Sequence, residues 1–148
     1  MIKSLIPIGD PLFHQKIKKC SYNLDRSKTS YILNENMFHY KGVGLSANQI
    51  GINERVFVMM SDIETEETIT CFNPKIIKES KEMISYKEGC LSYPDVFLDI
   101  ERPSKIVVKY EDEGKELHKI KLEGFIARIF QHEYDHMEGI DFTQRSSK

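Results

Sequence analysis

The sequence predicts an α+β protein in which antiparallel sheets pack with two helices. Short runs rich in β-branched and aromatic residues fill the middle of the chain, from about residue 55 to residue 122. Stretches with helical spacing of apolar residues stand on both sides of this region. No internal repeat or Gly/Pro-rich linker divides the 148 residues, so we expect one domain over 1–148. Helices that are segregated from the strand-rich region in this way are typical of α+β folds.

Composition limits the classes of function. Hydrophobic residues make up 40% of the chain and charged residues 30%, with a net charge of −2, so no broad basic field points to nucleic acid. No apolar run reaches membrane-spanning length, and the opening MIKSLIP is too short and polar for a signal peptide. Three cysteines at irregular spacing do not form a disulfide pattern. We therefore expect a soluble cytoplasmic protein without a membrane partner and with free thiols.

The first predicted helix covers residues 25–40. Asp25 or Ser27 is a suitable N-cap, because short polar side chains accept hydrogen bonds from the first free backbone N–H groups. Its apolar face has residues at i, i+4 and i+7: Leu33, Met37 and Tyr40. Lys41-Gly42 is a common helix stop, and the helix should end there.

The strands are predicted from six runs: RVFVMM, ETITCF, KIIKES, MISYKE, KIVVKY and ELHKIKL. Turn-forming residues separate several of them, at Asn73-Pro74, Tyr93-Pro94, Arg102-Pro103 and Asp112-Glu113-Gly114. The last of these breaks stands between KIVVKY and ELHKIKL, and it predicts a hairpin.

A second helix is predicted over residues 124–137, with Gly139 as its stop and a short extended piece at 140–142. One stripe of this helix carries Phe125, Ile129, His132 and His136. The other stripe is purely apolar, with Ile126, Phe130 and Met137, and is the better candidate for the core. The first stripe therefore looks like a pocket wall that ends in two imidazoles.

The segment His132-Glu133-Tyr134-Asp135-His136 carries the clearest chemistry. Imidazoles at i and i+4 project from successive turns and can bind one divalent ion without bending the backbone. Glu133 lies one step round the helix, where it can act as a proton acceptor beside the metal without being a ligand. The alternative is an ordinary helical pair of histidines. The full His-Glu-x-x-His pattern on a predicted helix favours the metal site.

A catalytic site of this kind generally has a third protein ligand. Asp141, an acidic residue after His136, is too close along the chain, so the ligand is expected upstream. Cys90 stands out because Gly89 precedes it and Pro94 follows, a setting that allows close backbone approach and a rigid exit. The remaining candidates are expected to be buried thiols, Cys20 and Cys71, and surface histidines, His14, His39 and His118.

Three segments now occur in order along the chain: GVGLSANQ from Gly42, EGCLS from Glu88 and HEYDH from His132. GVGLSA also fits the dinucleotide fingerprint, but a helix precedes it where that fold needs a strand. Together the three segments closely resemble the motifs of peptide deformylases. These metal-dependent hydrolases remove the formyl group from the N-terminal formyl-methionine of nascent polypeptides and release formate. The resemblance implies the deformylase α+β fold around a central metal-binding helix.

The resemblance also implies a role for each matching residue. The metal ligands are Cys90, His132 and His136, and Glu133 is the general acid/base. The Gln49 side-chain amide and the Leu91 backbone N–H stabilise the oxyanion. The substrate-binding residues are Val43, Gly44, Gly89, Phe125 and Ile129.

The resemblance implies one divalent ion per chain, Fe²⁺ in the cell and Zn²⁺ or Ni²⁺ in purified protein. The expected partners are N-formyl-methionyl nascent peptides, and the protein is expected to be a monomer. Three positions depart from the common family pattern: Ser46 replaces alanine, Arg128 replaces an apolar residue, and the chain stops shortly after Arg145. We therefore expect a member similar to the short bacteriophage deformylases, acting in the bacterial cytoplasm or an infected host cell, without the C-terminal extension that contributes to ribosome binding.

Two other functions are open. A metallopeptidase uses the same helix motif, but EGCLS and the lack of a downstream ligand weigh against it. A catalytically silent module that only grips N-terminal methionine is disfavoured because Glu133, Gln49 and the ligands are all present. We also expect Glu88, Arg102 and Asp135 to form an ion network that holds the Cys90 loop against the metal helix.

Overall fold

The computed structural model describes residues 1–146. Within them, helix α1 covers Arg26–His39 and helix α2 covers Gly124–Met137. Short 3₁₀ helices cover Pro11–Phe13, Ala47–Ile50 and Phe142–Arg145. No helix in this part of the chain has the length and apolar character needed to cross a membrane.

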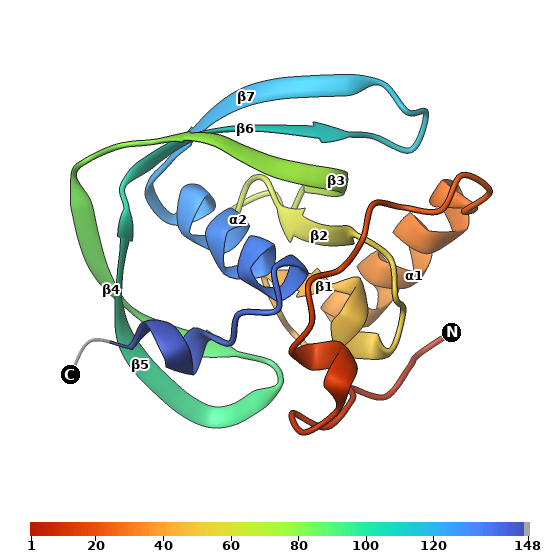
Figure 1. The fold of residues 1–148 in the computed structure, drawn as a ribbon, viewed down its shortest axis with the longest axis horizontal. Coiled ribbons are helices and arrows are strands. Elements are labelled where there is room, and N and C mark those ends of the chain that lie inside the picture. The colour runs from red at the N-terminus through yellow and green to blue at the C-terminus, as the bar shows by residue number, and fades with distance from the viewer. Residues whose placement is uncertain (147–148) are drawn as a thin grey trace.

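The strands form two antiparallel sheets. The larger sheet has the order β1-β2-β3-β6-β7, with β1 at Gly44–Ser46, β2 at Val56–Met60, β3 at Thr68–Glu79, β6 at Lys105–Glu111 and β7 at Leu117–Glu123. The smaller sheet pairs β4, Met83–Cys90, with β5, Tyr93–Pro103. In Figure 1, α2 lies between β3–β6–β7 above it and the β4–β5 sheet below it. The fold is thus α+β, as predicted.

The two helices begin and end close to the predicted positions. At α1 the Asp25 carboxylate accepts a hydrogen bond from the Lys28 N–H at 3.0 Å, so Asp25, and not Ser27, is the cap. Leu33 and Met37 are fully buried, and Tyr40 lies at the C-cap. Beyond α2, Gly139 has a φ of +72°, and a Cβ there would lie 2.6 Å from the Gln15 backbone. Glycine is therefore required at this stop for both reasons.

The core consists of two groups of apolar side chains. One lies between α2 and the larger sheet and includes Phe57, Val108, Phe130 and Met137. The other lies between α1 and strands β1–β3 and includes Leu33, Leu45 and Val58. No fully buried apolar residue of either group comes from β4 or β5, within the described residues. The smaller sheet is therefore attached to the rest of the molecule by other contacts.

The predicted hairpin between β6 and β7 is confirmed. The strands pair from Lys105↔Glu123 to Glu111↔Leu117. In the turn, the Asp112 Oδ1 accepts hydrogen bonds from the Gly114 N–H at 2.8 Å and the Glu116 N–H at 3.0 Å.

The local structure differs from the prediction in one break, in one strand that was missed, and in part of one extended piece. Asn73-Pro74 does not separate two strands: Asn73 takes a φ of +51°, the register shifts between Phe72 and Lys75, and β3 continues through this bulge. Strand β5 was not predicted as such. Of the predicted extended piece at 140–142, Asp141 has extended backbone angles, with φ −84° and ψ 140°. Phe142 already begins a 3₁₀ helix, which Asp141 caps by accepting a hydrogen bond from the Thr143 N–H at 2.8 Å.

Candidate metal centre

The two stripes of α2 have the predicted environments. Phe130 and Met137 are fully buried in the core, and Ile126 packs against it. On the other stripe, Phe125, Ile129 and His132 line a cavity of about 660 Å³ between α2, the β1 region and the β4–β5 sheet. One face of α2 therefore packs in the core, and the other face lines the cavity.

Cys90, at the end of β4, faces the two imidazoles of α2. One ligand atom from each of Cys90, His132 and His136 lies within 4.8 Å of the other two. The Cys90 Sγ is 3.6 Å from the His136 Nε2. A tetrahedral ion bonded to sulfur at about 2.3 Å and to nitrogen at about 2.05 Å holds those two atoms about 3.6 Å apart. The donor set and its spacing fit one divalent ion.

Both imidazoles are almost completely buried, but their surroundings differ. The His132 Nδ1 is 2.9 Å from the Glu88 Oε1, which leaves the Nε2 to face Cys90. Burial opposes the charge on His132, but hydrogen bonds with Cys90 and Glu88 raise the pKa of His132 to about 10. Burial and the positive charge of His132 hold the pKa of His136 well below its ordinary value. His132 therefore favours its protonated form in this cluster, whereas His136 favours the neutral form.

Glu133 lies beside these atoms and points away from the core. Burial raises the pKa of the Glu133 carboxyl to about 7. Its Oε1 is buried and has no hydrogen-bond partner among residues 1–146. The carboxylate packs against the backbone of Gly44, where an added Cβ would lie 2.8 Å from the Glu133 Oε2. A buried carboxyl with one free oxygen and a pKa near neutrality is suited to exchange protons.

The Gln49 amide has a fixed orientation. Its Oε1 accepts hydrogen bonds from the Ser46 N–H and the Ser46 hydroxyl, each at 3.0 Å. Its Nε2 donates to the Ser92 Oγ at 2.9 Å and lies 3.7 Å from the Cys90 Sγ. Because the oxygen is committed to Ser46, the NH₂ group must face Cys90. Ser46 therefore does more than keep the turn intact, since its hydroxyl adds a second bond to Gln49.

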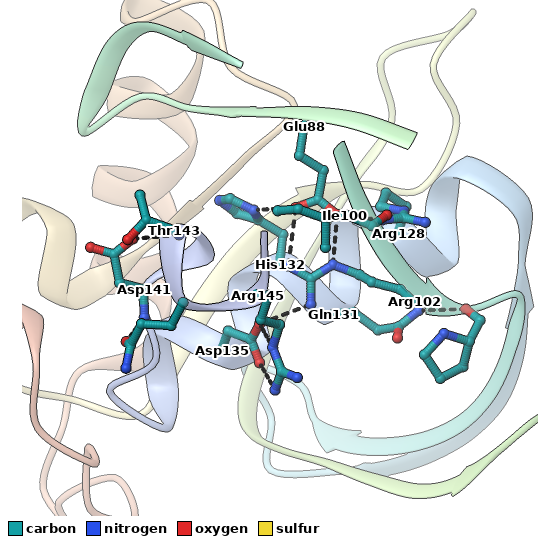
Figure 2. A network of polar contacts seen from close by, with 12 residues as sticks. Glu88, Ile100, Arg102, Arg128, Gln131, His132, Asp135, Asp141, Thr143 and Arg145 are labelled. Atoms are coloured by element: carbon teal, nitrogen blue, oxygen red, sulfur yellow. Dashed lines mark hydrogen bonds and ion pairs between the residues drawn. The ribbon is translucent and has the colours of Figure 1, made fainter. Parts of the chain in front are cut away.

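Glu88, Arg102 and Asp135 form the predicted ion network (Figure 2). Arg102 donates from Nε to the Glu88 Oε2 at 2.6 Å, from Nη2 to the Glu88 Oε1 at 3.0 Å, and from Nη1 to the Asp135 Oδ2 at 2.8 Å. Burial opposes ionisation of Glu88, but hydrogen bonds from His132 and Arg102 hold its pKa well below the ordinary value. Strand β4 is thus tied to the metal helix by charged groups.

The other predicted site residues also lie at this cavity. Its lining includes the residues predicted to stabilise the oxyanion or bind substrate: Val43, Gly44, Gln49, Gly89, Leu91, Phe125 and Ile129. At Gly89, an added Cβ would lie 2.8 Å from the Phe97 ring on β5. Glycine at that position makes room for an aromatic ring on the neighbouring strand.

The alternative ligands lie elsewhere. Cys71 is fully buried and Cys20 is partly buried, and both are free thiols. His14 and His39 are exposed, but His118 is half-buried and its Nε2 lies 2.8 Å from the Asp112 Oδ2. Asp141 accepts a hydrogen bond from the Tyr93 hydroxyl. None of these residues belongs to the Cys90 cluster.

Three contacts of the site were missed from the sequence. Ser92 accepts a hydrogen bond from Gln49. Arg128 donates to Glu88, and Arg145 donates to Asp135 (Figure 2). A signal was available for Arg128, because it stands four residues before His132 and so lies on the same side of α2. Ser92 and Arg145 have no comparable signal, since their partners are distant in sequence.

Fold and site together define the chain as a metal-dependent hydrolase. A sequence profile described as "Polypeptide deformylase" matches residues 2–148, and the chain belongs to the peptide deformylase family. It is 40% identical to the peptide deformylase of Thermotoga maritima over 140 residues, which cover 94% of this chain and 84% of that protein. Members of the family remove the N-formyl group from N-terminal formyl-methionine and release formate, and this is the activity of the chain.

Solved structures agree with this assignment. The crystal structure of the Thermotoga maritima peptide deformylase is similar with a TM-score of 0.92 and 36% identity, covering 100% of this chain and 99% of that chain. A probable peptide deformylase from Synechococcus phage S-SSM7 is similar with a TM-score of 0.87 and 36% identity, covering 97% of this chain and 99% of that chain. The likeness thus extends to a phage protein.

Proposed function

We propose that this deformylase works with a single divalent ion held by Cys90, His132 and His136, and with Glu133 as its general acid/base. The observation that carries the proposal is the convergence of one thiol and two imidazoles within 4.8 Å, with Cys90 and His132 at the wall of the cavity. When bound, such an ion lowers the pKa of a water molecule from near 16 to about 7, which makes hydroxide available at neutral pH. Every other step belongs to residues of the chain.

Glu133 moves the proton. Its free Oε1 accepts a proton from the attacking water, whose oxygen forms a bond to the formyl carbon. When the C–N bond breaks, Glu133 donates that proton to the amine nitrogen, and the formyl carbon leaves as formate. Burial raises the pKa of Glu133 to about 7, so both the protonated and the ionised form are available near neutral pH.

The Gln49 NH₂ group and the Leu91 backbone N–H donate to the formyl oxygen as it becomes negatively charged. Gln49 is supported in this role by the bonds from Ser46, which turn its Nε2 towards the cavity side of Cys90. The loss of one such donor typically raises the barrier by about 3 kcal/mol.

The peptide binds along β1. Strand β1 is at the edge of the larger sheet, and both Val43 and Gly44 line the cavity. An extended peptide can add to such an edge through backbone hydrogen bonds. The methionine side chain then enters the apolar part of the cavity beside Phe125, Ile129 and the His132 ring.

We infer that Fe²⁺ is the ion in the cell, and that Zn²⁺ or Ni²⁺ is found after aerobic purification. A thiolate adds negative charge to the ion, and it also exposes the site to oxidation of Cys90. Anaerobic purification followed by metal analysis tests this. A phage-type chain that acts as a monomer on nascent peptides in the bacterial cytoplasm is the context that we propose; gel filtration tests the oligomeric state.

The decisive assay compares two substrates and one variant. Formate should be released from formyl-Met-Ala, and a peptide with a blocked N-terminus should stay intact at its internal bonds. Glu133→Gln removes the proton acceptor but keeps the size of the side chain, so turnover should fall by a factor of about 10² to 10⁴. Metal analysis should find the ion still bound. A Glu133→Gln variant as active as the parent would remove Glu133 from the mechanism, and internal cleavage would indicate a peptidase.

A further inference from the structure

Arg128 is a buried cation close to the proposed metal centre, and the guanidinium hydrogen-bonds to Glu88 and to backbone carbonyls. Its Nη1 donates to the Glu88 Oε2 at 2.6 Å and to the Ile100 carbonyl at 2.8 Å. Its Nη2 donates to the Ile84 carbonyl at 2.5 Å. The guanidinium carbon lies 5.0 Å from the centroid of the Tyr86 ring. Arg128 is therefore fixed to the backbones of both β4 and β5, and its charge is directed at one carboxylate.

Glu88 distributes its two oxygens among three residues (Figure 2). The Oε1 lies 2.9 Å from the His132 Nδ1 and accepts from Arg102, and the Oε2 accepts from Arg102 and Arg128. Arg102 alone bridges both oxygens, so with Arg102 as the only cation the carboxylate and guanidinium could tilt as one unit. Arg128 adds a third point of attachment on the side opposite His132. Three points fix the plane of the carboxylate.

Arg128 and His132 are four residues apart on α2, so they project from the same side of the helix one turn apart. Glu88 reaches between them from β4 and contacts both. The direction of a ligating imidazole is set by the hydrogen bond at its other nitrogen. The hydrogen bond that the His132 Nδ1–H donates to Glu88 thus sets the direction of the His132 Nε2, and Arg128 holds Glu88 in place.

Neutralising Glu88 does not require Arg128. Arg102 already contacts Glu88 with two nitrogens, and Asp135 is contacted by both Arg102 and Arg145. A further cation that is only 5% exposed carries a desolvation penalty. We propose that Arg128 is a positioning residue for the metal centre, which holds the Glu88 carboxylate so that the His132 ring is directed at the ion. This inference rests on the proposed ligand role of His132.

The test measures the release of the ion, independently of catalysis. Parent, Arg128→Met, Arg128→Lys and Arg145→Met are loaded with Zn²⁺, and transfer of the ion to an excess of a chromogenic chelator is followed over time. Arg145→Met is the matched control, because Arg145 belongs to the same network but donates to Asp135 and not to Glu88. Thermal unfolding of each variant is measured in parallel.

We expect Arg128→Met to release Zn²⁺ about 10- to 100-fold faster than the parent, the range found when an outer partner of a metal ligand is removed. Arg128→Lys keeps one bond to Glu88, so its rate of Zn²⁺ release should lie between those of the parent and Arg128→Met, at least about threefold above the parent. The Co²⁺-loaded Arg128→Met should have shifted visible absorption bands, because the imidazole direction changes. Arg145→Met should stay close to the parent in both measurements.

Each other result overturns the inference. An Arg128→Met variant that releases Zn²⁺ at the parent rate shows that Arg128 does not position His132. If Arg145→Met accelerates Zn²⁺ release as much as Arg128→Met does, the effect is a general weakening of the ion network and is not specific to Glu88. If Arg128→Met does not fold, Arg128→Lys decides, and a parent-like rate for it has the same meaning. A parent protein that binds no ion overturns the proposed ligand set, which is a separate failure.

Discussion

Gly44 is the position where the structure makes the sharpest prediction about catalysis. It belongs to β1, and its missing side chain leaves room for Glu133 and Ile129. In Gly44→Ala the new Cβ would lie 2.8 Å from the Glu133 Oε2 and 3.0 Å from the Ile129 Cγ2. Ordinary contact begins at 3.4 Å, so the carboxylate oxygen has to move by at least 0.6 Å, the difference between 3.4 and 2.8.

A displacement of about 1 Å in a catalytic group costs about 100-fold in rate. We therefore expect kcat/KM of Gly44→Ala to fall on the order of 10- to 100-fold, with overpacking lowering stability by about 1–3 kcal/mol. Formate release from formyl-Met-Ala measures the first effect, and urea unfolding measures the second. Gly9→Ala is the control, because a Cβ there has no atom within 4 Å. A Gly44→Ala variant with kcat/KM within twofold of the parent would refute the assigned position of Glu133.

Three further predictions concern the ion network, the Cys20 thiol and the orientation of the Gln49 amide. Arg102→Ala leaves two buried carboxylates, Glu88 and Asp135, with fewer partners, so it should destabilise the protein by about 3–5 kcal/mol and weaken Zn²⁺ binding. Urea unfolding and metal titration measure the two effects, and unchanged values in both would show that the network does not support the site. Burial raises the pKa of the Cys20 thiol to about 11, and only the thiolate reacts with iodoacetamide. Alkylation of Cys20 should therefore be slow at pH 8 and should accelerate as the pH rises towards 11. A rate at pH 8 equal to that of the urea-unfolded protein would contradict this prediction. Ser46→Ala removes one of the two bonds that orient the Gln49 amide, so kcat should fall by a few-fold, about 1 kcal/mol, with KM unchanged; steady-state kinetics measure this, and a change confined to KM would point to substrate binding instead.

The sequence predicted the helices because their signals are local. An N-cap at Asp25, the spacing of apolar residues and the stop at Gly139 all act within a few residues, and both helices occur at the predicted positions. The HEYDH pattern is equally local. Cys90 could be proposed from its neighbours, but the approach of its sulfur to His136 depends on how β4 packs beside α2.

Long-range contacts explain what the sequence did not reveal. The residue types of Asn73-Pro74 are typical of a turn between strands. They form a bulge within β3 because the strand pairs with β2 before this point and with β6 on both sides of it. Strand β5 has an unusual inner face for its class, since both Ile100 and the charged Arg102 are buried. A buried arginine breaks the alternation of apolar and polar residues by which a strand is predicted. The sequence therefore did not predict β5.

The attachment of the β4–β5 sheet has a consequence for how the centre exchanges its contents. This sheet carries Cys90, the proposed sulfur ligand. It is joined to α2 through Glu88, Arg102 and Arg128, and it contributes no fully buried side chain to the two apolar groups. These charged groups are buried, and salt screens buried ion pairs much less than exposed ones. Partial opening of such a unit needs less free energy than global denaturation. Loading and loss of the ion can therefore proceed through local opening of the β4–β5 hairpin, without unfolding of the rest of the chain.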